Sequence, residues 1–273
     1  MATTQAGGRR SGQAGVGAMI REWRQRRRLS QLDLALEADI SQRHLSFMES
    51  GRARPSREMV LRLAEHMAVP LRQRNHLLLA AGFAPTYGER ELDDPVFRPA
   101  LAAVELVLKG HEPYPAIAVD RNWNMVLTNA SAAPFLEGID EPSLLSPPVN
   151  ALRLALHPGG LAPRIVNLGE WRADLLDRLR RQIDATADPA LAALERELSS
   201  YPGAPGRIAR SCDPASQIAV PMRVRINGET LSFISTVTVF GTPLDVTLSE
   251  LAIESFFPAD AATGAFLRKL AGG

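Results

Sequence analysis

The sequence has little cysteine and no long apolar segment. Its single cysteine, Cys212, excludes an internal disulfide framework and a zinc site built from several thiolates. No apolar run approaches the roughly 18–20 residues of a membrane span. The first residues, MATTQAGGRRSGQAG, lack the apolar core of a signal peptide. We therefore expect a cytoplasmic protein without a membrane partner.

The sequence also lacks the short motifs of common enzymes. It contains no G-x-S-x-G, no phosphate loop and no H-E-x-x-H. The Gly-Gly pairs at 7–8 and 159–160 lack the context of a phosphate loop. We expect no catalytic residue, no cofactor and no metal site.

The composition indicates two folded domains of different charge. The chain has 273 residues, of which 45% are hydrophobic and 22% charged. Residues 1–90 carry 15 Lys and Arg against 8 Asp and Glu, whereas residues 91–273 carry 16 against 22. The net charges, +7 and −6, suggest that the first part meets an anionic polymer. A solvated basic surface is the alternative.

Residues 16–82 have the pattern of five short helices, behind an arm over residues 1–15 that is small, polar and expected to be disordered. Ser30, Ser41 and Ser56 are suitable N-caps for the second, third and fourth helices. Pro70 opens a fifth, and Gly82 lies past its end.

Residues 83–95 hold two prolines and several charges and are expected to form a linker. Residues 96–273 then predict an α+β domain with an antiparallel sheet of about five strands. Strands are expected at 116–120, 124–128 and 246–258, and Asn227-Gly228 favours a hairpin over 222–240. Helices are expected at 99–109, 130–137, 149–156, 169–184, 188–199 and 261–270, and 201–214 is expected to be irregular.

The segment SQLDLALEADISQRHLSFMESGRARPS (30–56) carries the main functional signal. Two short helices packed steeply need a small residue midway along the first, and Ala35 supplies it. The turn between them needs a left-handed backbone, which Asp39 tolerates better than most residues. Ile40, Leu45 and Met48 are expected to close the core between the helices.

The pattern S-Q-x-x-L-A … I-S … E-x-G-x-x-x-P-S resembles the lambda-repressor/Cro-like (XRE) family of helix-turn-helix domains. The resemblance covers residues 16–81 and implies that the helix after Ser41 enters the major groove of double-stranded DNA, with a homodimer reading two half-sites. Base contacts are expected from the start of this helix, and phosphate contacts from the residues before and after it. The implied DNA-binding residues are Gln31, Ser41, Gln42, Arg43, His44, Ser46, Arg52 and Arg54.

Some polar residues of this region have a structural interpretation. Glu49 would be unfavourable against DNA, so we expect it to form an ion pair with Arg24. The run Arg26-Arg27-Arg28 either neutralises phosphate or is a solvated helix end. His44 is equally a surface residue and indicates no metal.

The segment AIAVDRNWNMVLTNASAAPFL (116–136) resembles the opening hairpin of a PAS-type sensor domain. Together with Leu156-His157-Pro158, and behind an XRE-like domain, it resembles the MmyB-like regulators. That resemblance implies a PAS-like domain that binds a fatty acid or an acyl derivative.

An acyl site needs an apolar channel and one polar group for the head. We selected apolar residues of the expected strands and helices, although each is also a normal core residue, and two candidate carboxylate partners, which have ordinary structural roles as the alternative. The ligand-binding candidates are Ile117, Val119, Val126, Leu152, Leu156, His157, Arg164, Trp171, Leu175 and Phe233.

Three functions remain open from the sequence. The first is a transcription regulator whose C-terminal domain senses a small apolar ligand. The second is a DNA-binding regulator whose C-terminal domain binds a protein, as an antitoxin-like regulator or a sigma-factor partner would. The third, an enzyme with a fused DNA-binding domain, has no motif in its support. A cavity in the second domain favours the first function, and a filled core with an exposed apolar patch favours the second.

Overall fold

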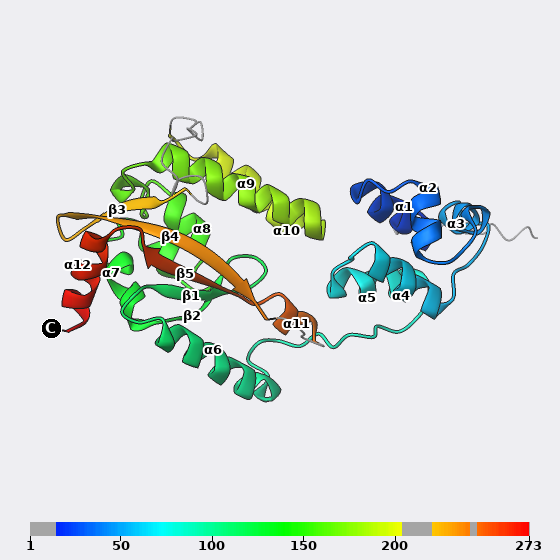
Figure 1. Ribbon diagram of the computed structural model, residues 1–273, viewed down its shortest axis with the longest axis horizontal. Coiled ribbons are helices and arrows are strands. Elements are labelled where there is room, and N and C mark those ends of the chain that lie inside the picture. The colour runs from blue at the N-terminus through cyan, green and yellow to red at the C-terminus, as the bar shows by residue number, and fades with distance from the viewer. Residues whose placement is uncertain (1–14, 204–219, 241–244, 273) are drawn as a thin grey trace, which may run out of the picture. The chain divides into compact units, whose positions relative to one another are not determined.

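The computed structural model describes residues 15–203, 220–240 and 245–272 and divides the chain into two units (Figure 1). The units are Met1–Glu89 and Arg90–Gly273. The expected arm, apart from Gly15, lies outside the described residues, and so do Cys212 and most of the segment 201–214. Each unit is described by itself.

The N-terminal unit consists of helices joined by short turns. They are α1 (Val16–Arg26), α2 (Gln31–Glu37), α3 (Gln42–Glu49), α4 (Arg57–His66) and α5 (Leu71–Ala80). The predicted serine caps are confirmed: the hydroxyls of Ser30, Ser41 and Ser56 each accept a hydrogen bond from the backbone N–H three residues on. Such caps satisfy backbone donors that have no partner inside the helix.

The connection between α2 and α3 has the predicted left-handed residue. Asp39 has a φ of 52°, and the next N–H, that of Ile40, donates to the carbonyl of Ala35 at 2.9 Å. Ala35, Leu45 and Met48 are buried, and Ile40 is half-buried. The turn therefore brings the two helices together over a small residue, as expected.

A close approach between α1 and α3 escaped the sequence analysis. A Cβ added at Gly17 would lie 2.2 Å from the carbonyl oxygen of Met48 and 2.9 Å from that of Glu49. Only a residue without a side chain lets the two backbones come this near. Gly17 thus fixes the position of α3 against α1.

The C-terminal unit is built on one five-stranded antiparallel sheet with strand order β2-β1-β5-β4-β3. The strands are β1 (Ala116–Val119), β2 (Met125–Thr128), β3 (Met222–Ile226), β4 (Glu229–Val239) and β5 (Ala252–Pro258). The predicted β3–β4 hairpin is confirmed, because Asn227 and Gly228 form its turn with φ values of 50° and 81°. The expected α+β, PAS-like arrangement is confirmed.

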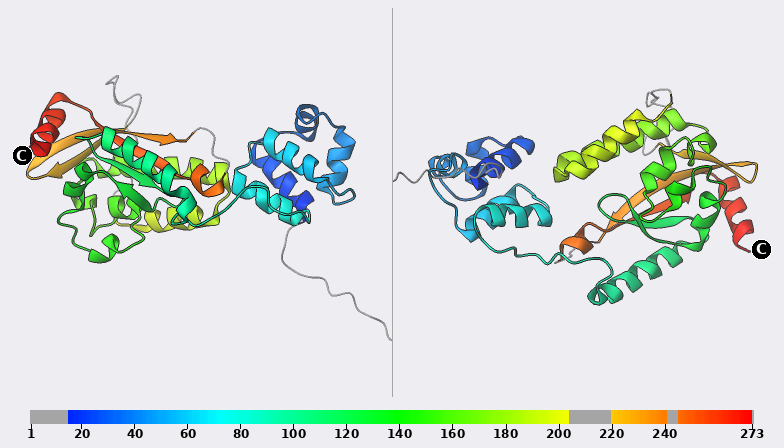
Figure 2. Two further views of the ribbon diagram at one scale, coloured as in Figure 1. Left: turned by 90° about the horizontal axis from the view of Figure 1, so that it is seen from below. Right: turned by 180° about the vertical axis from the view of Figure 1, so that it is seen from behind.

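Helices lie on both faces of this sheet (Figures 1 and 2). On one face, Val104 and Leu108 of α6 pack against Ala116, Ala118 and Ile253. On the other, α8, α9 and α10 form a larger apolar cluster with the sheet. The helices and short 3₁₀ segments (η) are η1 (Pro95–Phe97), α6 (Arg98–Gly110), η2 (Ala130–Ala132), α7 (Ala133–Leu136), η3 (Pro142–Leu145), α8 (Ala151–Leu156), η4 (Ala162–Arg164), α9 (Leu168–Thr186), α10 (Pro189–Ser200), α11 (Val246–Ser249) and α12 (Ala261–Ala271).

The prediction of one strand over 246–258 is wrong in its first half. Residues 246–249 form α11, and β5 begins only at Ala252. The carboxylate of Asp245 accepts a hydrogen bond from the N–H of Thr247 at 2.8 Å. This cap turns the chain into a helix despite its β-branched residues.

Within the described ranges, no helix combines the length and the apolar character that a membrane span needs. The same residues contain no cluster of three or more His, Cys, Asp or Glu side chains suited to a metal ion.

Candidate nucleic-acid interface and ligand cavity

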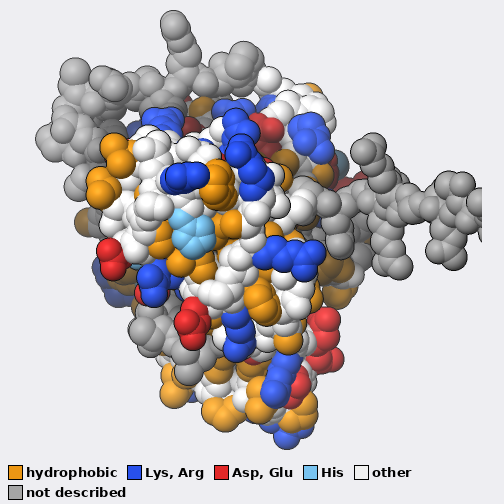
Figure 3. Space-filling model, turned by 90° about the vertical axis from the view of Figure 1, so that its right-hand side faces the viewer, with side chains coloured by type: hydrophobic (Ala, Val, Ile, Leu, Met, Phe, Trp, Pro, Cys, Tyr) orange, Lys and Arg blue, Asp and Glu red, His pale blue; other side chains and the backbone are white. Residues whose placement is uncertain are grey.

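The first turn of α3 presents polar side chains to solvent. Ser41, Gln42, Arg43 and His44 are exposed and Ser46 is half-buried, while Leu45 and Met48 face the core. The helix period produces this division between a reading face and a core face. Basic side chains are scattered over the face shown in Figure 3, and every Lys or Arg residue of 1–90 is an arginine.

Three arginines of this region carry unneutralised charge. Arg43 and Arg52 both stack on the Phe47 ring, with guanidinium carbons 5.3 and 5.1 Å from its centroid. Arg54 is exposed in the turn after α3. None of the three forms an ion pair with a described residue. Exposed cations of this kind suit contact with phosphate or with guanine.

A buried ion pair connects α3 to α1, as predicted. The guanidinium of Arg24 donates to both carboxylate oxygens of Glu49, at 2.6 and 2.9 Å. The amide of Gln31 donates to Glu49 at 2.8 Å. Burial pushes the pKa of Glu49 upward, but the hydrogen bonds from Arg24 and Gln31 outweigh it and hold the pKa below its usual value. Phosphate binding by Gln31 stays a prediction, and its amide already has this internal partner.

One member of the arginine run has a structural role. Arg27 donates to the carbonyl oxygens of Met67 and Ala68 at 2.7 and 3.0 Å, and its guanidinium lies 5.2 Å from the centroid of the Trp23 ring. Burial lowers its pKa. Arg27 therefore ties α1 to the end of α4.

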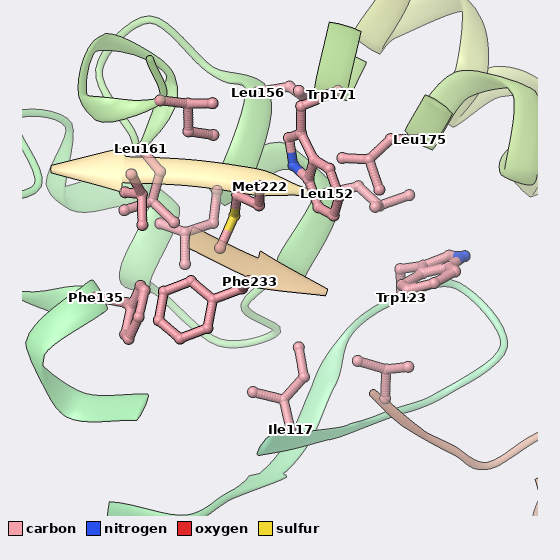
Figure 4. Packing of buried hydrophobic residues seen from close by; sticks show 14 of the residues in the cluster. Ile117, Trp123, Phe135, Leu152, Leu156, Leu161, Trp171, Leu175, Met222 and Phe233 are labelled. Atoms are coloured by element: carbon pink, nitrogen blue, oxygen red, sulfur yellow. The ribbon is translucent and has the colours of Figure 1, made fainter. Parts of the chain in front are cut away.

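The C-terminal unit contains a cavity between the sheet and the helices α7, α8 and α9. Figure 4 shows several residues of its wall, among them Ile117, Leu152 and Trp171. Its volume is about 80 Å³. A single water needs roughly 10–15 Å³, so the space holds a group several times larger. It is lined by Pro115, Ile117, Met125, Ala132, Phe135, Leu136, Ala151, Leu152, Leu154, Ala155, Leu161, Trp171, Leu175, Met222, Glu254 and Phe256.

Four of the ten candidate ligand residues line this cavity: Ile117, Leu152, Trp171 and Leu175. Val119, Leu156 and Phe233 belong to the surrounding apolar cluster without lining the cavity. Val126 packs under α6, on the other face of the sheet. A sequence pattern identifies apolar positions but does not separate a cavity wall from a filled core.

The two candidate carboxylate partners do not line the cavity, and both hold nearby backbone. Nδ1 of His157 accepts from the N–H of Gly159 at 3.0 Å. Arg164 donates to the carbonyl oxygens of Phe135 and Glu137 at 2.8 and 2.7 Å, and burial lowers its pKa. Their carboxylate role stays a prediction.

The polar residue that does line the cavity was missed by the sequence analysis. Glu254 on β5 lies opposite Ile117 on β1, and cross-strand neighbours share one face of a sheet. Its carboxylate accepts a hydrogen bond from Arg178 of α9 at 3.0 Å, and Arg178 also donates to the hydroxyl of Ser235 at 3.2 Å. Only the pairing of β1 with β5, which joins distant segments, reveals this placement.

Comparison with known families assigns a domain to each unit. A family described as the MmyB-like transcription regulator ligand binding domain matches residues 100–270. A second family, described as helix-turn-helix, matches residues 20–73. No curated protein matches the chain.

Proposed function

Since the chain belongs to the MmyB-like transcription regulators, and so is a DNA-binding regulator with a ligand-sensing domain, we propose that an apolar ligand in its cavity changes its affinity for DNA. The ligand we propose is a fatty acid or an acyl derivative. The observation that carries the proposal is the cavity of about 80 Å³, whose wall is almost entirely apolar.

For the DNA side, we propose that a cytoplasmic homodimer binds two half-sites about one helical turn apart. Gln42 and Arg43 read base edges, with His44, Ser41 and Ser46 beside them. The phosphate contacts come from Gln31, Arg52 and Arg54. The exposure of the first turn of α3 and the unpaired guanidinium groups support these roles.

The coupling between ligand and DNA is a linkage effect. A ligand changes DNA affinity only by as much as it prefers one arrangement of the dimer over another. An acyl chain between the sheet and the helices α8 and α9 would shift how the second domains pack. The duplex fixes the spacing of the half-sites. A change in the distance between the two α3 helices of the dimer therefore changes how well they fit the two half-sites. This function requires no catalysis and no cofactor.

The test is to extract the purified full-length chain with organic solvent and to identify the extract by mass spectrometry. The proposal predicts about one acid or acyl ester per chain, or uptake of one when it is supplied. A chain that neither carries nor takes up any apolar compound would contradict it.

The alternative, a C-terminal domain that binds a protein, has one observation in its favour. On α6, Leu106 is 72% exposed and Val107 is 49% exposed. Neighbouring apolar side chains exposed on one helix are suited to a protein contact. If this alternative holds, replacing Leu106 by Lys would abolish protein binding by the second domain. If the cavity senses a ligand, the same replacement would leave ligand uptake unchanged.

A further inference from the structure

We propose that the cavity binds a neutral acyl derivative, an ester or an amide, whose carbonyl oxygen accepts a hydrogen bond from Nε1 of Trp171, and that it excludes a free carboxylate. This inference rests on the proposed ligand-sensing function and specifies the chemistry of the ligand.

The indole of Trp171 carries the donor. The side chain is 3% exposed and lines the cavity, and Nε1 has no hydrogen-bond partner among the described residues. In Figure 4 the indole nitrogen is turned toward the side of the cluster that holds Leu161 and Met222, two further residues of the cavity wall. By contrast, Nε1 of the buried Trp123 donates to Gln182 at 2.8 Å. A buried donor without a partner is costly and uncommon in a native fold.

The chemistry of the wall decides what satisfies that donor. An indole N–H only donates, so its partner must be an acceptor. The side chains that line the cavity are hydrocarbon, apart from the weakly accepting sulfurs of Met125 and Met222 and the carboxylate of Glu254, which is bound to Arg178. A ligand that brings a carbonyl oxygen into this space removes the cost of the unpaired N–H.

Glu254 decides the charge of the ligand. It is 4% exposed and, among the described residues of the wall, the one ionisable group. Its partner Arg178 is committed to Glu254 and Ser235. A ligand carboxylate in the cavity would face this buried acid without a cation of its own, and burying an unpaired charge is unfavourable. An ester or an amide has the carbonyl oxygen without the charge.

Arg164 is the other cation to consider. Its Nε also lacks a partner among the described residues, but Arg164 does not line the cavity, and both of its terminal nitrogens donate to backbone carbonyls of the α7 region. It holds the wall in place, and no cation lines the interior among the residues that the structure describes.

The experiment is calorimetric titration of the full-length chain with chain-matched probes: octanoate, methyl octanoate, octanamide and octane. We expect the ester and the amide to bind about tenfold or more tightly than octanoate at neutral pH. Trp171→Phe keeps an aromatic ring and removes the N–H, so it should weaken the ester and the amide about five- to tenfold, a typical hydrogen-bond contribution, and leave octane unchanged. Glu254→Gln should reduce the difference in affinity between octanoate and the ester.

Three results overturn the inference. The first is that octanoate binds as tightly as the ester; a selective loss of octanoate binding in Arg164→Gln would then place the carboxylate site at Arg164. The second is an equal loss of affinity for octane and the ester in Trp171→Phe, with unchanged thermal melting. The indole would then only pack against the hydrocarbon chain of the ligand. The third is that the full-length chain binds none of the four probes. This result would also contradict the proposed sensing function, whereas the first two results would leave that function standing.

Discussion

Glu49 of α3 accepts two hydrogen bonds from Arg24 of α1, at 2.6 and 2.9 Å, with both side chains almost fully buried. The acid lies one turn or more beyond the exposed reading residues of the same helix. Its charge is therefore neutralised inside the domain and is not presented to DNA. The same pair fixes the position of α3, on which any base contact depends.

Glu49→Gln should destabilise the N-terminal unit by up to about 3 kcal/mol, because it leaves the guanidinium of Arg24 buried without its counter-charge. Urea unfolding followed by circular dichroism measures the change. Glu65→Gln, at an exposed position of α4, is the matched control and should have little effect. Equal stability of the two variants would contradict the role given to the pair.

The same pair predicts a pH dependence. The pKa of Glu49 is lowered in the folded state, so its contribution to stability is complete above the unfolded pKa, near 4.5, and is lost as the pH falls through the folded value. The difference in unfolding free energy between the natural chain and Glu49→Gln should therefore be constant above the unfolded pKa and shrink as the pH falls below about 4.5. A difference that stays constant as the solution is acidified below about pH 4.5 would show that Glu49 does not titrate as described.

Gly17→Ala should destabilise the same unit by about 1–3 kcal/mol, because its Cβ would collide with the backbone carbonyls of α3. Gly15→Ala is the control, since a Cβ there meets nothing within 4 Å. Thermal melting of both variants measures the effect. If the two substitutions proved equally harmless, the close approach of α1 to α3 would be wrong.

Gln42→Ala and Arg43→Ala should each relax the preference at particular base pairs, at about 1–3 kcal/mol, because these exposed side chains begin the reading helix. Arg54→Ala should weaken binding to all sequences alike and reduce the salt dependence of binding, since we propose that Arg54 contacts phosphate. Binding of each variant to a series of mutated operators, at several salt concentrations, separates the two roles. Identical profiles for Gln42→Ala and Arg54→Ala would place the reading helix elsewhere.

The features predicted correctly from the sequence are those encoded over a few neighbouring residues. The serine caps, the left-handed Asp39 and the Asn227-Gly228 turn each depend on local backbone preferences. The strand expected over 246–258 failed for the same kind of reason, because the cap from Asp245 outweighs the β-branched composition that follows it.

The features that were missed depend on contacts between distant segments. Gly17 looks like an ordinary helix glycine until α3 lies against it. Glu254 looks like a solvent-facing residue of a strand until α9 brings Arg178 to it. Ile117 and Phe233 are both apolar and buried, yet only the first lines the cavity, and nothing in a local pattern separates them.

The central claim is that occupancy of the cavity changes DNA affinity. The most direct measurement is fluorescence anisotropy of a labelled DNA fragment from upstream of the gene, titrated with the full-length chain first stripped of apolar compounds and then reloaded with the compound identified by mass spectrometry. The account predicts a several-fold change in affinity, a coupling of about 1–3 kcal/mol. An unchanged affinity with about one ligand bound per chain would contradict it and leave the second domain a carrier without a regulatory role.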